Sequence, residues 1–394
     1  MLSYEKNFAP RSDGRCVCTM AAQMERMRHM QPSLRYKAGM SQSDHAVWKA
    51  KIKEKIKELL CMPEVTPQPA PKLLSTVQRD GYRVEKWELY PDDFTAVPFL
   101  ALIPDSASEK NRMPGILCLP GSNHSKEFVA GEELLDHPNC QVVSWPERNQ
   151  MGKIMAQNGM AAFVFDNPAT GECSVLGDPA FGETQFDSRV HMTAGYLRVG
   201  LNYVGMSVFQ KLRALEFIRS LPYIDVDKLA ISAHSLGTEP AMMLGLLCDD
   251  IKAIIHTDAL NNRLIRFAAI TEEPENKMVQ DIGNWHIIPG MLSYFDYADL
   301  CAAYAPNYLA LTEGGGEEPV GRVVNAYKMM GAENNLIVTY YPEYSDIAKR
   351  ESHGLMPDHG ISVPEYYHYN NIAPEDHSFR REPSLELLRR CFGK

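Results

Sequence analysis

The segment from Leu229 to Leu247 constrains the fold of this 394-residue chain more than any other. A short apolar run suited to a buried strand leads into Ala233-His234-Ser235-Leu236-Gly237, and a helix rich in small residues follows. A serine on a sharp turn between strand and helix is held clear of the backbone, where a substrate can reach it. Small residues two before and two after it allow the strand and the helix to cross closely. We therefore take Ser235 as the candidate nucleophile, although a five-residue match alone also fits an ordinary surface serine.

Strand and helix patterns alternate along most of the chain, which is typical of a parallel sheet with crossover helices. Besides the strand before Ser235, strands are expected at residues 73–78, 82–90, 97–103, 115–119, 161–165, 251–256, 308–312 and 336–341. The sequence thus predicts an α/β fold with a mostly parallel central sheet flanked by helices.

The N-terminal part differs in pattern from the rest. Residues 1–42 are polar and rich in methionine, and a helix with one apolar stripe is expected from Ser43 to Leu60. We therefore divide the chain into an N-terminal arm and helical extension (1–71) and a catalytic domain (72–394). Two long connections in that domain, about 167–200 and 342–376, are rich in Gly, Pro and aromatic residues and are expected to shape the substrate site.

Composition narrows the choice of partners and compartment. A net charge of −10 and a pI near 5.7 argue against nucleic acid or an anionic membrane as partner. No apolar run approaches the roughly 18 residues of a membrane helix. Nine cysteines, an odd number, suit reduced thiols in the cytoplasm, and the N-terminus does not resemble a secretory signal. Cys16 and Cys18 lack a second Cys/His pair at metal spacing, so no metal is expected. Self-association is left open.

Several motifs resemble those of one superfamily. The Ser235 turn resembles the nucleophile turn of α/β-hydrolases, with Ala233 where glycine is usual. Many α/β-hydrolases begin with antiparallel strands that lead into a parallel core, so the resemblance implies this arrangement for the strands at 73–78, 82–90 and 97–103. The closer resemblance, from about Leu73 to the C-terminus, is to acetyl xylan esterase-like and dienelactone-hydrolase-like bacterial serine esterases. The motifs that carry it are Pro114–Ser122, Asp166–Glu172, Leu221–Ile231, Pro289–Leu300 and Tyr340–Pro342. The departures are Ala233, a glutamate where aspartate is usual, and a long insertion before His377.

A serine needs a base to take its proton. In the superfamily that the motifs resemble, the order along the chain is serine, acid, histidine. His377, after the last strand and before a closing amphipathic helix, matches the histidine's place. The alternatives are His353, His359 and His368 in the preceding loop.

The resemblance also implies an acid after the strand at 308–312, where relatives often have G-x-x-D. Here Gly314 is followed by Glu317 at that spacing, which makes Glu317 the first candidate. Glu313, at the strand end, is a competitor. Asp258, just past the strand at 251–256, is a third.

Acyl transfer further needs donors for the developing oxyanion. One is expected from the backbone N–H of Leu236, at a helix N-terminus. The second is expected from the loop that contains Ser122 and Asn123. His124 either faces the substrate or is a solvated loop histidine.

Together these features predict a serine hydrolase that cleaves carboxylic esters through an acyl-serine, without metal or organic cofactor. The resemblance implies a small-molecule ester as substrate, such as an acetylated carbohydrate. The alternatives are a serine peptidase of the same fold and a catalytically inactive binding protein that keeps the fold.

Overall fold

The computed structural model describes residues 10–122, 124–135, 146–174, 185–266, 269–272, 277–278, 283–351, 357 and 360–393. Nine strands of this part of the chain form one sheet. They are β1 (Lys72–Gln78), β2 (Tyr82–Leu89), β3 (Val97–Pro104), β4 (Met113–Leu119), β5 (Ala161–Phe165), β6 (Ile224–His234), β7 (Ile251–Thr257), β10 (Tyr308–Leu311) and β11 (Leu336–Val338).

Their order in the sheet is β1-β2-β3-β5-β4-β6-β7-β10-β11. The pairs among β1, β2, β3 and β5 are antiparallel. All pairs from β5 to β11 are parallel. The antiparallel start and the parallel core are therefore as the sequence predicted, and the carboxyl ends of β4, β6, β7 and β10 meet at one edge of the sheet.

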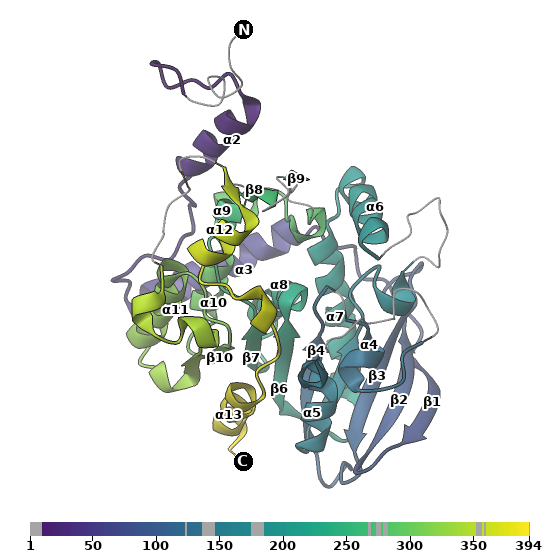
Figure 1. The fold of residues 1–394 in the computed structure, drawn as a ribbon. Helices are drawn as coiled ribbons and strands as arrows, with labels where there is room; N and C mark the ends of the chain where they lie inside the picture. Colours follow the sequence, from purple (N-terminus) through teal and green to yellow (C-terminus); the bar gives the residue numbers. More distant parts are fainter. Residues whose placement is uncertain are drawn as a thin grey trace.

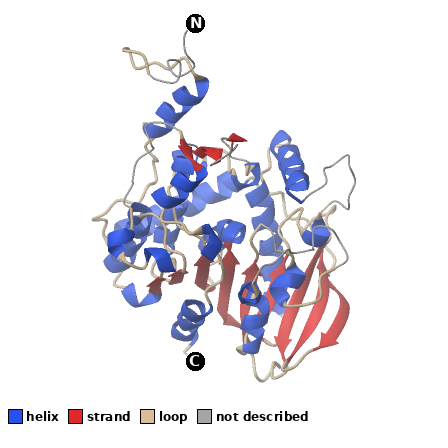
Figure 2. Ribbon diagram, in the orientation of Figure 1, coloured by secondary structure: helices blue, strands red, loops and turns tan. Residues whose placement is uncertain are grey.

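Helices cover both faces of the sheet (Figures 1 and 2). They are α3 (Gln42–Leu60), α4 (Lys126–Ala130), α5 (Met151–Gln157), α7 (Tyr203–Ser220), α8 (Thr238–Leu247), α10 (Tyr297–Tyr304), α11 (Glu317–Met329) and α13 (Arg381–Phe392). Buried residues of α4, α5 and α13 pack with Ile116 and Cys118 of β4. Those of α3, α7, α8, α10 and α11 pack with Leu117 and Leu119 of the same strand. This alternation along one fully buried strand builds the two cores of a three-layer α/β/α fold, and the predicted fold class is confirmed.

The N-terminal helix α3 shares the main core. Trp48, Ile52, Ile56 and Leu60 recur along one side of the helix and are buried in that core. Its start differs from the prediction, because Ser41 and not Ser43 is the cap. The Ser41 hydroxyl accepts the N–H of Asp44 at 3.1 Å, and the Asp44 carboxylate accepts the N–H of Ser41 at 3.2 Å. The division of the chain after residue 71 stays a prediction.

The two long connections contain regular structure that the sequence did not indicate. The first contains α6 (Gln185–Arg198), and the second contains α12 (Val363–Tyr369) and β12 (Ile361–Ser362). β12 pairs with β8 (Ala269–Glu272), which pairs with β9 (Lys277–Met278).

The N-terminal helix α2 (Thr19–Arg28) lies at the same end of the molecule as α12 (Figure 1). Its Met24 packs with Leu264, Ile265, Ile361 and Tyr366. Within the described residues, no helix is both long and apolar enough to cross a bilayer.

We expect Ile52→Ala to lower the free energy of unfolding by about 2–5 kcal/mol, because the side chain is fully buried against the sheet core. Lys51→Ala, one residue earlier on the exposed side of α3, is the matched control and should change it by less than about 0.5 kcal/mol. Urea unfolding followed by circular dichroism measures both. Equal effects of the two variants would contradict the packing of α3 on the core.

Candidate active site

Ser235 occupies a strained turn between β6 and α8. Its φ of +50° lies in the left-handed region, which residues other than glycine seldom adopt. The turn also passes very close to β4, because a Cβ on Gly237 would lie 2.4 Å from the carbonyl oxygen of Leu119. Only glycine permits this crossing, and the buried Ala233 supplies the other small residue. The geometry is that of a nucleophile turn, as the sequence indicated.

His377 is oriented by a buried carboxylate, and that carboxylate belongs to Glu313. The Nδ1–H of His377 donates to Oε2 of Glu313 at 2.6 Å. The hydroxyl of Tyr341 donates to the same oxygen at 2.8 Å, and the N–H of Ser378 donates to Oε1 at 2.8 Å. Three donors thus fix the fully buried Glu313 carboxylate, which in turn fixes the imidazole.

The carboxylate that contacts His377 is therefore that of Glu313, the second candidate, and not that of Glu317, the first candidate. Glu317 begins α11, and its carboxylate forms an ion pair with Arg350 at 3.7 Å. The reason is the turn that follows Glu313. Gly314 and Gly315 both have positive φ, and the chain pairs there with Leu260: the Leu260 N–H donates to Gly314 O at 2.8 Å. A Cβ on Gly315 would lie 1.9 Å from the Leu260 carbonyl oxygen. These two glycines permit the close contact with Leu260, and the turn that they form directs the chain at residue 317 away from His377.

The remaining candidates for the acid and for the histidine lie in different places. Asp258 lies near the pair, with ligand atoms of Asp258, Glu313 and His377 all within 4.8 Å of one another. His368 is exposed and contacts Glu351 at 2.6 Å. His353 and His359 lie outside the described residues.

A second histidine packs against the first. The rings of His234 and His377 stack with centroids 4.5 Å apart. Burial, together with the neighbouring His377, His124 and Arg380, holds the pKa of His234 well below its ordinary value, so His234 is neutral. Burial would also lower the pKa of His377, but the Glu313 carboxylate overrides this and raises it above the ordinary value. The sequence analysis did not assign a role to His234, although its place beside Ser235 at the end of β6 is a usable signal.

The predicted oxyanion loop lies beside Ser235. Ser122 and Leu236 line the same cavity as Ser235, and Asn123 lies outside the described residues. Two side chains donate hydrogen bonds to backbone carbonyls of this loop. Arg189 Nη2 donates to the carbonyl of Ser122 at 2.7 Å, and Asn167 Nδ2 donates to that of Pro120 at 2.8 Å.

His124 does not have the solvated place that the sequence left open. It is buried and stacks on Phe128 at 5.0 Å. Burial lowers its pKa to about 3.

An open cavity of about 770 Å³ contains the site. Its lining residues are Ser122, Ser235, Leu236, Asp258, Asn261, Arg263, Arg266, His286, Tyr341, Tyr366, Tyr367, Ile372, Pro374 and His377. The 342–376 connection contributes four of them, Tyr366, Tyr367, Ile372 and Pro374. From the 167–200 connection, Arg189 acts behind the Ser122 loop. The sequence analysis missed Asn261, Arg263 and Arg266, which follow the carboxyl end of β7, where ligands of such sheets usually bind.

Asp258, Glu313 and His377 carry oxygen and nitrogen atoms that a divalent cation also uses. In the structure, however, the proton on His377 Nδ1 is directed at Glu313, and two further donors occupy that carboxylate. A ligand nitrogen must be free of its proton. The arrangement thus fits a positioned base better than a metal centre.

The three-layer fold, the strained serine turn and the acid–histidine pair define an α/β-hydrolase. Residues 3–390 match the model of the Abhydrolase family, and the chain belongs to that family. No functionally curated protein matches the sequence.

Solved structures agree with this assignment. A Bacteroides fragilis NCTC 9343 protein that bears the provisional name acetyl xylan esterase superposes with a TM-score of 0.89 at 28% identity, over 98% of this chain and 99% of that one. A methylesterase superposes with a TM-score of 0.54 at 14% identity, over 88% of this chain and 69% of that one. A glucuronoyl esterase from Solibacter usitatus superposes with a TM-score of 0.50 at 15% identity, over 77% of this chain and 86% of that one. The last two show the fold alone. The resemblance to acetyl xylan esterase-like hydrolases is confirmed.

We expect Glu313→Gln to lower the pKa of His377, because the neutral amide no longer stabilises the imidazolium. Glu317→Gln is the matched control and should leave that pKa within about 0.3, since its charge is already paired with Arg350. NMR titration of the His377 ring resonances measures both. An unchanged pKa in Glu313→Gln, with the fold intact, would contradict the pairing.

Proposed function

We propose that the protein is a serine esterase that hydrolyses carboxylic esters through an acyl-serine. One observation carries the proposal: Ser235 and His377 line one cavity, and a buried Glu313 orients His377. Nucleophile, base and acid come from the ends of β6, the C-terminal loop and β10, which meet at one edge of the sheet.

The mechanism follows from these positions. His377 Nε2 takes the proton of the Ser235 hydroxyl as its oxygen attacks the ester carbonyl. Backbone N–H groups of Leu236 and of the Ser122–Asn123 loop stabilise the oxyanion. The intermediate collapses, the alcohol leaves with the proton from His377, and acyl-Ser235 forms. His377 then takes a proton from water, whose oxygen attacks the acyl group. As this second intermediate collapses, His377 returns the proton to the Ser235 oxygen, and the acid and free Ser235 are released.

Glu313 stays ionised throughout and stabilises the imidazolium that forms twice in the cycle. The neutral ring of His234 gives His377 a flat contact surface that carries no competing charge. Each step uses groups of the chain and water, and the mechanism needs neither metal nor organic cofactor.

As substrate we propose an acetyl ester of a carbohydrate. The name of the Bacteroides fragilis relative supports this class, because the two chains align over nearly their full lengths. The cavity adds acceptors that suit sugar hydroxyls: Asn261 Oδ1 is buried without a donor from the described residues, and Asp258 also lines the cavity. A cytoplasmic location stays a prediction from composition.

The two alternatives predict different chemistry. A serine peptidase of the same fold would cleave peptides in preference to acetyl esters. An inactive binding protein would not react with a fluorophosphonate, which needs an activated serine.

We expect wild-type protein to be labelled by a fluorophosphonate at the peptide that contains Ser235, as mapped by mass spectrometry. Ser235→Ala should lose labelling and about 10⁴-fold or more in kcat on 4-nitrophenyl acetate, since triad members act as a unit. Ser232→Ala, a buried serine on the same strand, is the control and should keep both. A folded Ser235→Ala variant with more than about a tenth of wild-type activity would refute the assignment.

Replacing the acid that orients His377 should lower kcat. Glu313→Gln is expected to reduce kcat more than about a hundredfold, because the imidazole can settle in the wrong tautomer. Glu317→Gln should stay within about threefold of wild type, since Glu317 pairs with Arg350 and does not contact His377. Steady-state kinetics with 4-nitrophenyl acetate, with melting curves for both variants, measure this. An active Glu313→Gln beside an inactive, folded Glu317→Gln would reverse the assignment.

A further inference from the structure

A second pair of histidine and acid lies at the cavity that contains Ser235. His286 lines this cavity, and its Nδ1 contacts Oε1 of Glu239 at 2.8 Å. The Glu239 side chain is 1% exposed, whereas that of His286 is 21% exposed. The contact repeats the one between Glu313 and His377, in which a buried carboxylate also orients an imidazole through Nδ1.

The chain just after the nucleophile holds His286 at two points. His286 and the neighbouring Trp285 belong to one short helical turn. Trp285 is buried and packs with Leu236, the residue after Ser235. Glu239, four residues after Ser235, contacts the His286 ring itself. Because both contacts come from the same few residues, the imidazole has a fixed place relative to the serine.

The contact with Glu239 also decides which ring nitrogen of His286 carries the proton. Oε1 of Glu239 accepts a hydrogen bond from Nη2 of Arg263 at 3.1 Å, so this oxygen acts as an acceptor. In the neutral imidazole one nitrogen donates and the other accepts, which places the proton on Nδ1. Nε2 of His286 is then an acceptor. In the described part of the chain it has no hydrogen-bond partner, and it is not one of the fully enclosed polar atoms.

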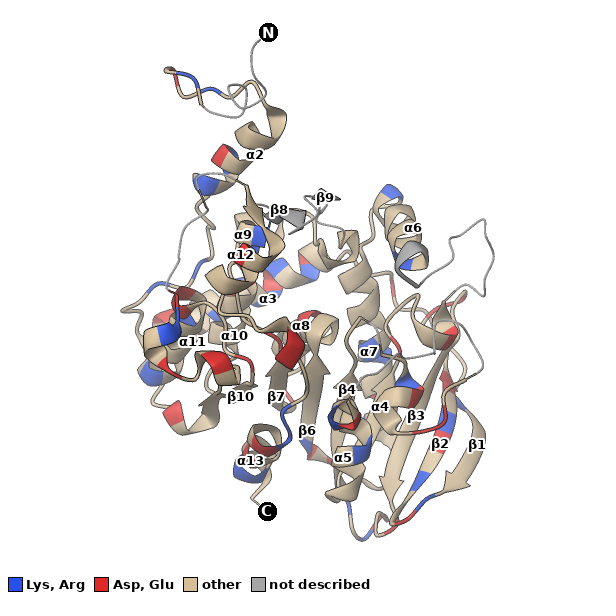
Figure 3. Ribbon diagram, in the orientation of Figure 1, with Lys and Arg blue, Asp and Glu red and all other residues tan. Residues whose placement is uncertain are grey.

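Asp258 is a second acceptor close to this pair. Its Oδ2 lies 3.8 Å from Nη2 of Arg263, the same atom that donates to Glu239. Arg263 begins the short helix α9 (Arg263–Arg266), whose basic positions lie beside α12 (Figure 3). Asp258 and His286 both line the serine cavity. An ester group brings only acceptors, so these two residues are complementary to a ligand that also carries hydrogen-bond donors.

We propose that His286 is a specificity-determining residue whose Nε2 accepts a hydrogen bond from a free hydroxyl of the ester substrate, which rests on the proposed function of Ser235. The proposed acetyl group has no hydroxyl, so the hydroxyl belongs to the alcohol part. The substrate class is then a partly acetylated carbohydrate with an unesterified hydroxyl near the acetyl group. A site that bonds a substrate hydroxyl discriminates against an analogue without it, because its own polar group then loses a partner.

The test compares kcat/KM on the mono-O-acetyl esters of methyl β-D-xylopyranoside with that on their dideoxy derivatives, in which hydrogen replaces both remaining hydroxyls. Wild type should prefer at least one monoacetate over its dideoxy derivative by about fivefold or more, the size of one neutral hydrogen bond. His286→Asn keeps an N–H for Glu239 in the place of Nδ1 but has no atom in the place of Nε2. It should reduce the preference to less than about twofold. His286→Gln, whose amide oxygen can reach the place of Nε2, should retain part of it.

His29→Asn is the matched control, because His29 is an exposed histidine of α2 whose Nδ1 contacts the backbone oxygen of Glu25. It should keep the full preference. A folded His286→Asn protein that also keeps it would overturn the role of His286. The two sources of a hydroxyl are separated with 4-nitrophenyl glycolate. A preference for this ester over 4-nitrophenyl acetate, without one for any monoacetate, would overturn the placement in the alcohol part.

Binding separates this inference from the proposed function. Ser235→Ala protein, titrated calorimetrically, should bind the preferred monoacetate more tightly than its dideoxy derivative, and the additional His286→Asn change should remove the difference. Ester hydrolysis without any preference for a free hydroxyl, in rate or in binding, would overturn the role of His286 alone. Hydroxyl-dependent binding that requires His286, in a wild-type protein that hydrolyses none of the esters, would support the hydroxyl site and refute the esterase.

Discussion

The site depends on the crossing of the Ser235 turn over β4. Ser235 is held at φ +50°, a conformation that costs on the order of 1–3 kcal/mol and persists only where the surroundings over-determine it. Here β6 pairs with β4 on one side and β7 on the other. Gly237 lets the start of α8 touch the carbonyl of Leu119. The same approach that strains the serine brings it to the loop after β4, so a single contact places the proposed nucleophile beside the proposed oxyanion loop.

Buried charges then hold the loops around this contact. Lys126 follows the β4 loop, and its Nζ lies 2.9 Å from Asp166, 2.8 Å from Glu127 and 2.7 Å from Glu172. Its backbone N–H also donates to Asp166 at 2.7 Å. Removing one member of such a cluster leaves an unpaired buried charge, which costs far more than the intact cluster contributes. Arg189 and Asn167 add hydrogen bonds to the carbonyls of the same loop. The loop after β4, which we propose supplies oxyanion donors, is therefore fixed by contacts from several other elements.

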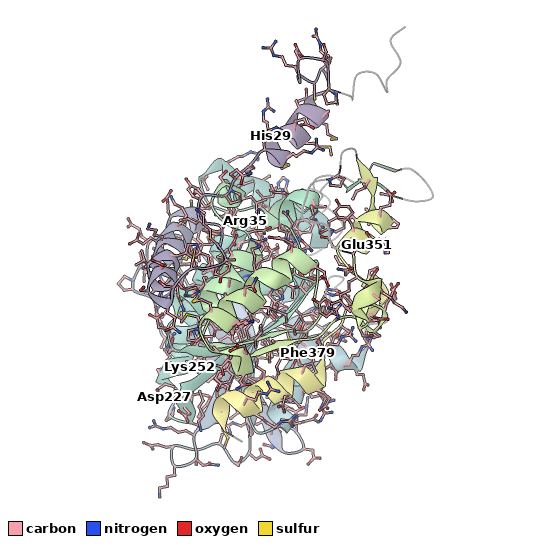
Figure 4. The ribbon with its side chains drawn as sticks, turned by 90° about the vertical axis from the view of Figure 1, so that its left-hand side faces the viewer. His29, Arg35, Asp227, Lys252, Glu351 and Phe379 are labelled. Atoms are coloured by element: carbon pink, nitrogen blue, oxygen red, sulfur yellow. The ribbon has the colours of Figure 1, made fainter. Side chains whose placement is uncertain are left out.

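The sequence predicted what depends on local patterns and missed what depends on tertiary contacts. The buried strands, the serine turn and the place of His377 follow from periodicity, small residues and chain order. Glu313 and Glu317 could not be separated that way, because the choice depends on the pairing of Gly314 and Gly315 with Leu260, more than 50 residues away. The structure of the two long connections was missed for the same reason. Figure 4 labels Glu351, in the second connection, and Phe379, just before α13. Between these two residues the chain contains α12 and the loop of His377.

Glu239 links the two parts of the cavity. It follows the nucleophile by four residues, in the first turn of α8, and is almost fully buried. Its Oε1 contacts both Arg263 and His286, so these two basic residues of the cavity lining are tied to the helix that begins at the serine turn. A carboxylate on a rigid helix positions a guanidinium better than a loop residue would, because neither partner can relax without leaving a buried charge unpaired. The positions of Arg263 and His286 relative to Ser235 are thus set by the first turn of α8.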